Sequence, residues 1–237
     1  MNKESFFENY LSSVYGCLDM YQIEDKSAQF EYNYSKYFPA DKNSRILEIG
    51  PGCGSMLLLW RRLGFKNYTA VDVSPQVIDF CRKKGLEVML IKNLQDFLKD
   101  NQERFDFISM LEVIEHIDKD EILNTFTLLK NSLKPKGRVI IETPNMGAVF
   151  GTLLRYHDFT HNVGFVSHSL LQLVITAGFE EVEIRGFEGI YRRDLRSMVR
   201  KFLRNYCLYP AIRITRKIND SDLTDILSPY IYVTAVR

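Results

Sequence analysis

The feature that most constrains this chain is a regular alternation, from Ser44 onward, between short β-rich runs and amphipathic stretches. Such alternation is typical of βαβ units, in which helices connect parallel strands. Five strands are expected in this part of the chain: Arg45–Ile49, Tyr68–Val73, Leu86–Ile91, Phe105–Met110 and Gly137–Thr143. The helices between them are expected at Ser55–Leu63, Pro75–Lys84, Leu94–Lys99 and Lys119–Leu133. The pattern predicts an α/β fold built on a parallel sheet.

The remaining segments complete this sheet and elaborate it. A loop at Pro144–His168 is expected to precede a helix at Leu170–Ala177 and a strand at Glu181–Phe187, and Tyr230–Val236 is the last strand. The first forty residues are rich in Tyr and Phe and have a helical pattern, so we expect them to cap one end of the sheet. We expect a single domain over residues 1–237, divided into a cap (1–43), a cofactor-binding core (44–187), a basic amphipathic insertion (188–226) and the last strand (227–237).

Composition excludes several classes of protein. Apolar residues make up 46% of the 237 residues and charged residues 26%, as in soluble globular chains and unlike disordered or collagen-like ones. The longest strictly apolar run, Met56–Trp60, is far shorter than the ~20 residues that span a bilayer, and the N-terminus has no apolar signal region. The four cysteines lie far apart and are expected to be reduced, so a cytoplasmic location is expected, with the inner face of the membrane as an alternative.

A glycine-rich turn follows the first strand. Gly50, Gly52 and Gly54 let the backbone bend sharply and approach a ligand at the start of the next helix. Asp72 ends the second strand about 20 residues later, where an acid can accept hydrogen bonds from ribose hydroxyls. The dinucleotide pattern G-x-G-x-x-G would need glycine at position 55, which is Ser55 here.

The segment Glu48–Gly54, followed by Val71–Ser74, resembles the first two motifs of class I S-adenosylmethionine-dependent methyltransferases. The resemblance implies a Rossmann-like, seven-stranded, mostly parallel sheet whose last strand is antiparallel. It implies that S-adenosylmethionine is the cofactor, with Glu48 and the glycines at its methionine part and Asp72 at its ribose. The cofactor contacts it implies are Glu48, Gly50, Pro51, Gly52, Gly54, Asp72, Val73, Asn93, Leu94 and Leu111.

A group of acids and an imidazole follows the fourth strand. Glu112, Glu115 and His116 have the spacing i, i+3, i+4, so a helical conformation would place them on one face. Such a group is either a divalent-metal site or an acid–base set. All four histidines of the chain lie here or in the loop after the fifth strand, which also holds Asp158.

This combination resembles two metal-using groups of methyltransferases, the catechol O-methyltransferases of ubiquinone synthesis and the enzymes that methylate the terminal ribose of small RNAs. The resemblance implies a site for Mg²⁺, Mn²⁺ or Zn²⁺ formed by Glu112, Glu115, His116 and His161, with His157 as the second choice for the last ligand. The predicted catalytic residues are His116, Glu112, His161 and Asp158. His168 is expected to have a capping or surface role.

The net charge of +1 conceals a strong asymmetry. Between Arg185 and Lys217 there are ten Lys or Arg and two Asp or Glu, a local charge of +8, which leaves −7 on the rest of the chain. From Leu195 to Tyr206 apolar residues follow one helical stripe with arginines opposite, and Pro210 is expected to end this helix. Three interpretations remain open: a helix packed on its domain, an anionic-membrane contact through residues 192–217, or contact with nucleic acid or a polyanionic glycan.

The insertion and the last strand loosely resemble methyltransferases of cell-surface polysaccharide synthesis. We therefore expect methyl transfer to a hydroxyl, most simply on a sugar of a glycan of the O-antigen or lipopolysaccharide type, which would be lipid-linked. A catechol of quinone synthesis is the alternative acceptor, and nucleic acid is expected least. A scaffold that binds the cofactor without catalysis is the alternative of a different class.

Overall fold

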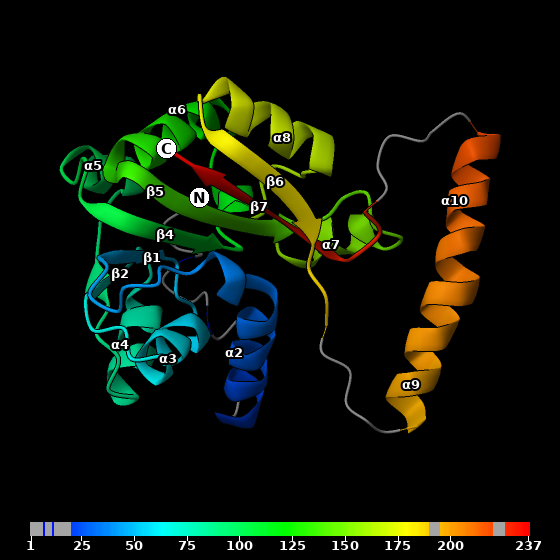
Figure 1. The fold of residues 1–237 in the computed structure, drawn as a ribbon, viewed down its shortest axis with the longest axis horizontal. Coiled ribbons are helices and arrows are strands. Elements are labelled where there is room, and N and C mark those ends of the chain that lie inside the picture. The colour runs from blue at the N-terminus through cyan, green and yellow to red at the C-terminus, as the bar shows by residue number, and fades with distance from the viewer. Residues whose placement is uncertain (1–6, 8–10, 12–19, 190–194, 220–225) are drawn as a thin grey trace.

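The fold is an α/β sandwich around one seven-stranded sheet, seen in a computed structural model that describes Phe7, Leu11 and residues 20–189, 195–219 and 226–237 (Figure 1). The strands are β1 (Ile46–Ile49), β2 (Tyr68–Asp72), β3 (Met89–Leu90), β4 (Phe105–Leu111), β5 (Leu133–Pro144), β6 (Glu180–Gly186) and β7 (Tyr230–Val236). Their order is β3-β2-β1-β4-β5-β7-β6. Strands β1 to β5 pair in parallel, and β7 pairs antiparallel with both β5 and β6. The predicted fold, with its antiparallel last strand, is confirmed.

Helices cover both faces of the sheet. Their bounds are α2 (Met20–Tyr34), α3 (Ser55–Arg62), α4 (Pro75–Lys83), α5 (Leu94–Lys99), α6 (Lys119–Ser132), α7 (Gly151–His157) and α8 (Ser167–Thr176). Helices α5, α6 and α8 lie on one face, and α2, α3 and α4 lie on the other (Figure 1). Because both faces are covered, the central strands are apolar almost throughout. Polar groups at strand ends therefore concentrate at the carboxyl edge of the sheet, where open α/β sheets bind their ligands.

Helix α2 forms the described part of the N-terminal cap. Its Phe30 and Tyr34 pack against Phe187 at the end of β6, and Tyr34 also contacts Tyr232 of β7 with ring centres 4.9 Å apart. Phe30 and Tyr34 are thus core residues, as an aromatic stripe most often is, whereas Tyr32 of the same helix is 62% exposed. Most of residues 1–19 lie outside the described residues, although Phe7 and Leu11 belong to the described part.

Several predicted boundaries were wrong. Strand β3 is confined to Met89–Leu90, because it is an edge strand whose two side chains are exposed. The predicted loop after β5 contains helix α7, and α8 begins at Ser167, where the Ser169 hydroxyl accepts a hydrogen bond from the Val166 N–H at 3.1 Å. His168 is therefore the second residue of that helix.

The predicted helix end at Pro210 was also wrong. Helix α9 (Leu195–Phe202) continues through a π-helical segment, η4 (Leu203–Leu208), into α10 (Tyr209–Ile218), as Figure 1 shows. Proline disrupts an α-helix because it lacks an N–H and its ring meets the carbonyl four residues earlier. The wider turn just before Pro210 changes that spacing, so the helix passes the proline. Among the described residues, no helix is both long and apolar enough to cross a membrane.

Stability should depend on the apolar face that α6 turns toward the sheet. Leu129 is fully buried there, so Leu129→Ala should lower the free energy of unfolding by about 2–5 kcal/mol. Leu123 lies on the same helix but is 42% exposed, so Leu123→Ala should change it by less than about 0.5 kcal/mol. Urea denaturation measures both, and equal losses would contradict the assigned face.

Candidate active site

The glycine-rich turn opens the carboxyl edge of the sheet. Gly50, Gly52 and Gly54 all have left-handed backbones, with φ of 68°, 52° and 82°, which other residues adopt with strain. A Cβ at Gly50 would lie 2.3 Å from a methyl carbon of Val113. The turn therefore brings bare backbone to the start of α3, as close approach of a ligand requires.

A cavity of about 240 Å³ lies beside this turn. Its wall contains seven of the ten predicted cofactor residues: Gly50, Gly52, Asp72, Val73, Asn93, Leu94 and Leu111. Burial raises the pKa of Asp72 to about 6, although N–H groups of residues 73 and 74 lower it. Asn93 also caps α5, since its side-chain oxygen accepts a hydrogen bond from the Asp96 N–H at 3.0 Å. The structure thus brings an acid and an amide to one side of a largely apolar cavity.

An adjoining cavity is lined by two of the other three predicted residues, Glu48 and Pro51, and by Ser55. Gly54, the third, lines neither cavity and belongs to the turn itself. The Glu48 carboxyl is buried and accepts hydrogen bonds from Ser109 Oγ and from Trp60 Nε1 at 3.3 Å. Burial raises its pKa to about 8, against these hydrogen bonds. The buried Ser55 hydroxyl has no hydrogen-bond partner in the described residues. A polar ligand group would satisfy it, and sequence reasoning missed this residue.

The predicted helical face after β4 is not formed. Glu112 has a left-handed backbone with φ of 56°, and only Ile114–His116 make a short 3₁₀ turn, η3. The left-handed residue turns the chain between the two acids, so Glu112 and Glu115 diverge. Glu112 forms an ion pair with Lys26 of α2 at 2.9 Å, whereas Glu115 is buried on the other side and accepts a hydrogen bond from Thr143.

Three of the four predicted metal ligands meet nonetheless. Ligand atoms of Glu115, His116 and His161 all lie within 4.8 Å of one another. The Oε1 atom of Glu115 is buried with no hydrogen-bond partner in the described residues, and it lies 3.9 Å from Nε2 of His161. Two imidazoles and a carboxylate form a donor set typical of catalytic zinc and of other first-row transition metals. His157, the second choice, is exposed at the end of α7 and lies outside this group.

Hydrogen bonds behind the two histidines orient them. Nδ1 of His161 lies 3.1 Å from the Leu154 carbonyl, so it carries the proton and Nε2 faces Glu115. Nδ1 of His116 lies 2.8 Å from Thr160 Oγ1, which donates to Asp158 at 2.6 Å. Asp158, predicted as catalytic, thus lies behind His116. This arrangement is typical of the groups that support metal-binding histidines.

The same environment keeps both imidazoles neutral at pH 7. Burial and the neighbouring His161 lower the pKa of His116 to about 4. Burial also lowers the pKa of His161, although Asp158 raises it. Neutral imidazole is the form that binds metals.

Helix α2 brings further groups that the sequence analysis did not identify. A cavity of about 440 Å³ beside Glu112 is lined by Gln22, Asp25, Lys26, Gln29, Phe30, Glu112, Glu142, Phe187 and Tyr230. The Glu142 carboxyl is buried and accepts a hydrogen bond from the Tyr34 hydroxyl. Burial, and then Glu112, raise its pKa to about 8. This cavity shares Lys26, Phe30 and Glu112 with the one around Glu48, so the two adjoin.

Comparison with known proteins identifies the fold family. Residues 24–184, more than half of the chain, match the family described as methyltransferase domain. The chain belongs to this family. The match confirms the expected S-adenosylmethionine-dependent methyltransferase, and the seven-stranded sheet is that of class I. No curated protein sequence matches the chain significantly.

Solved structures share this methyltransferase fold. A SAM-dependent methyltransferase from Archaeoglobus fulgidus has a TM-score of 0.70 at 22% identity, over 96% of this chain and 98% of that one. One from Thermotoga maritima has a TM-score of 0.63 at 17% identity, over 99% of each chain. Phosphoethanolamine N-methyltransferase 2 of Haemonchus contortus, in complex with S-adenosylmethionine, has a TM-score of 0.60 at 16% identity, over 98% of this chain and 60% of that one.

The turn geometry predicts different effects for two glycine substitutions. Gly50→Ala adds a left-handed strain and displaces Val113 at the cavity wall, so it should weaken S-adenosylmethionine binding strongly. Gly64 has φ of 83° with nothing within 4 Å of an added Cβ, so Gly64→Ala adds strain alone. Isothermal titration should find wild-type affinity for Gly64→Ala. Equal affinities in the two variants would refute the close approach at Gly50.

Proposed function

We propose that S-adenosylmethionine lies across the carboxyl ends of β1 and β2, with its methionine part at the glycine turn and its ribose at Asp72. The two adjoining cavities on either side of Gly50 support this placement. The methionine carboxylate would reach the start of α3, where Ser55 offers its buried hydroxyl. Asn93 and Leu94 would flank the adenine.

The pKa of Asp72 makes cofactor affinity pH-dependent. Ribose hydroxyls donate to the ionised carboxylate, so binding should weaken below about pH 6, by about tenfold per pH unit well below it. Asp72→Asn should bind more weakly at pH 7 and lose this dependence. Asp79→Asn, an exposed acid on α4, should behave as the wild type. Isothermal titration calorimetry at several pH values measures the affinity of each variant for S-adenosylmethionine. If Asp72→Asn has the same pH profile as the wild type, Asp72 does not bind the ribose.

We propose further that the protein is an O-methyltransferase whose acceptor hydroxyl is activated by a divalent metal held by Glu115, His116 and His161. The observation that carries this proposal is the buried Glu115 oxygen, which has no hydrogen-bond partner in the described residues and faces His161. Methyl transfer is an in-line displacement from a sulfonium, so the remaining need is a positioned and nucleophilic acceptor. A bound metal would lower the pKa of a hydroxyl, which is otherwise a poor nucleophile. The two imidazoles favour Zn²⁺ or Mn²⁺ over Mg²⁺.

The cavity beside α2 supports a sugar as the acceptor. Glu112 lines this cavity and also the one that contains His116, so we propose that the sugar lies beside Glu112 with its reacting hydroxyl directed toward the metal site. It combines aromatic surfaces at Phe187 and Tyr230 with hydrogen-bonding side chains at Gln29, Lys26 and Glu142. A sugar ring presents apolar C–H faces and a rim of hydroxyls, and such a mixed wall matches both. We propose a cell-surface glycan as its source, in keeping with the loose resemblance in the insertion.

Labelled-methyl transfer tests the acceptor. The protein and S-adenosylmethionine carrying a labelled methyl group are incubated with fractionated lipid-linked glycans from the source cells. Acid hydrolysis should then release the label as an O-methyl sugar. Label recovered on a catechol or an amine would overturn the sugar assignment. Cofactor binding with no transfer to any fraction would instead indicate a scaffold.

The metal proposal predicts opposite outcomes for two histidines. His161→Ala should lose Zn²⁺ or Mn²⁺ binding and lower methyl transfer by more than about 100-fold, because it removes a ligand and not only a supporting contact. His157→Ala, exposed at the end of α7, should keep both. Cofactor affinity should be unchanged in each. Full activity of the wild type in excess chelator would refute the metal.

A further inference from the structure

The helix between β6 and β7 has an unusual orientation on its domain. We call residues 195–219, which comprise α9, η4, α10 and Asn219, the basic helix. No residue in it is buried. Nine large apolar side chains are between 43% and 76% exposed: Leu195, Met198, Val199, Phe202, Leu203, Tyr206, Leu208, Ile214 and Ile218. A helix packed on its domain would bury such a stripe, so that interpretation does not account for it.

Seven positions of the basic helix are half-buried: Ser197, Arg204, Asn205, Tyr209, Pro210, Ile212 and Arg216. Arg216 donates a hydrogen bond to the Gly147 carbonyl. None of the nine exposed apolar side chains is among these seven, so the apolar stripe does not pack on the domain. In Figure 1 the helix stands beyond α7, apart from the sheet.

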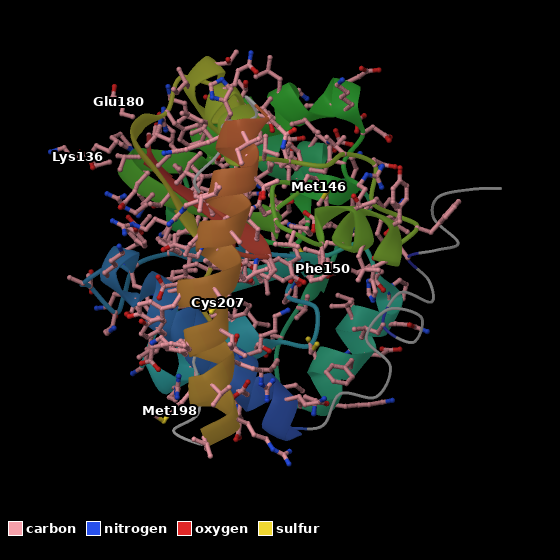
Figure 2. The ribbon with its side chains drawn as sticks, turned by 90° about the vertical axis from the view of Figure 1, so that its right-hand side faces the viewer. Lys136, Met146, Phe150, Glu180, Met198 and Cys207 are labelled. Atoms are coloured by element: carbon pink, nitrogen blue, oxygen red, sulfur yellow. The ribbon has the colours of Figure 1, made fainter. Side chains whose placement is uncertain are left out.

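A second apolar segment lies on the same side of the molecule. In the connection from β5 to α8, five apolar side chains are between 45% and 83% exposed: Val149, Phe150, Leu153, Tyr156 and Phe159. Figure 2 views this side, with the helix that carries Met198 and Cys207 in front and Phe150 to one side of it. Arg216 of that helix donates its hydrogen bond to Gly147, three residues before Phe150. Exposed apolar side chains gathered in this number on one side of a protein mark an interaction site.

The charge of the basic helix identifies the partner. It contains seven Lys or Arg and no Asp or Glu: Arg196, Arg200, Lys201, Arg204, Arg213, Arg216 and Lys217. A symmetric pair of such helices would bring like charges together. Nucleic acid would use the cations but not the aliphatic stripe. Cations beside a stripe of Leu, Ile, Val, Met and Phe match the interface of an anionic bilayer, where both are stabilised.

We propose that the basic helix and the exposed side chains of residues 149–159 form a surface that binds anionic lipid membranes. The helix would lie in the plane of the interface, with its apolar stripe among the acyl chains and its cations at the headgroups. The second segment runs directly into Asp158 and His161 of the site. Docking would therefore bring the site next to the bilayer, where lipid-linked acceptors are located.

Vesicle binding by the full chain tests the surface. The protein should bind vesicles that contain phosphatidylglycerol, should bind phosphatidylcholine vesicles far less, and should dissociate as salt is raised. A triple variant, Arg200→Gln, Arg213→Gln and Lys217→Gln, should bind about 100-fold more weakly, at about fivefold per cation. A matched variant, Arg82→Gln, Lys83→Gln and Lys99→Gln, removes the same charge from α4 and α5 and should bind as the wild type.

The apolar side is tested by Met198→Ser, Phe202→Ser and Tyr206→Ser, exposed positions whose change should weaken vesicle binding without unfolding the chain. Unchanged circular dichroism and S-adenosylmethionine affinity in every variant verify the fold and separate this result from the proposed function.

Absence of binding to anionic vesicles would overturn the proposal. Equal losses in the two charge variants would also do so. Salt-sensitive binding to oligonucleotides without vesicle binding would assign the surface to nucleic acid. Self-association abolished by the apolar variant, again without vesicle binding, would assign it to a second copy.

Discussion

The ion pair between Lys26 and Glu112 joins the N-terminal cap to the end of β4, and the arrangement of the site depends on it. Burial is costly for a carboxylate unless it is paired or protonated. Here Glu48, Glu112 and Glu142 lie at the ends of three adjacent strands. Although burial lowers the pKa of Lys26, Glu112 raises it above its ordinary value, so α2 supplies a permanent cation. The same helix brings Tyr34 to Glu142 and lines one side of the cavity beside Glu112.

Features set by neighbouring residues could be predicted from the sequence. The glycine turn and Asp72 were located correctly, because left-handed glycines and a strand end are local properties. The arrangement of Glu112, Glu115 and His116 after β4 was harder to predict, since the spacing of these residues fits a helix. The left-handed backbone of Glu112 sends Glu112 and Glu115 apart, and residue spacing does not encode that choice. The helix end predicted at Pro210 was wrong for a similar reason, because the π-helical turn that accommodates the proline has no sequence signal.

The remaining site groups come together through long-range packing. Lys26 is 86 residues from Glu112, and Tyr34 is 108 from Glu142. Neither pair has a pattern that links its members along the chain. The Thr160 hydroxyl is another example, since it lies between Asp158 and His116 and forms hydrogen bonds with both. Sequence analysis identified the residue types, and packing determined their partners.

The charge asymmetry acquires a physical meaning from the orientation of the basic helix. A local charge of +8 is compatible with a solvated surface, and an apolar stripe is compatible with core packing. The structure combines them in a way that neither interpretation allows, because the apolar stripe stays exposed on the same helix as the cations. A folded chain exposes such a stripe at a cost in free energy of about 25 cal/mol per Å². That cost is recovered where the stripe leaves water, and the surrounding cations favour an anionic surface with an apolar interior, as in the membrane binding that we propose.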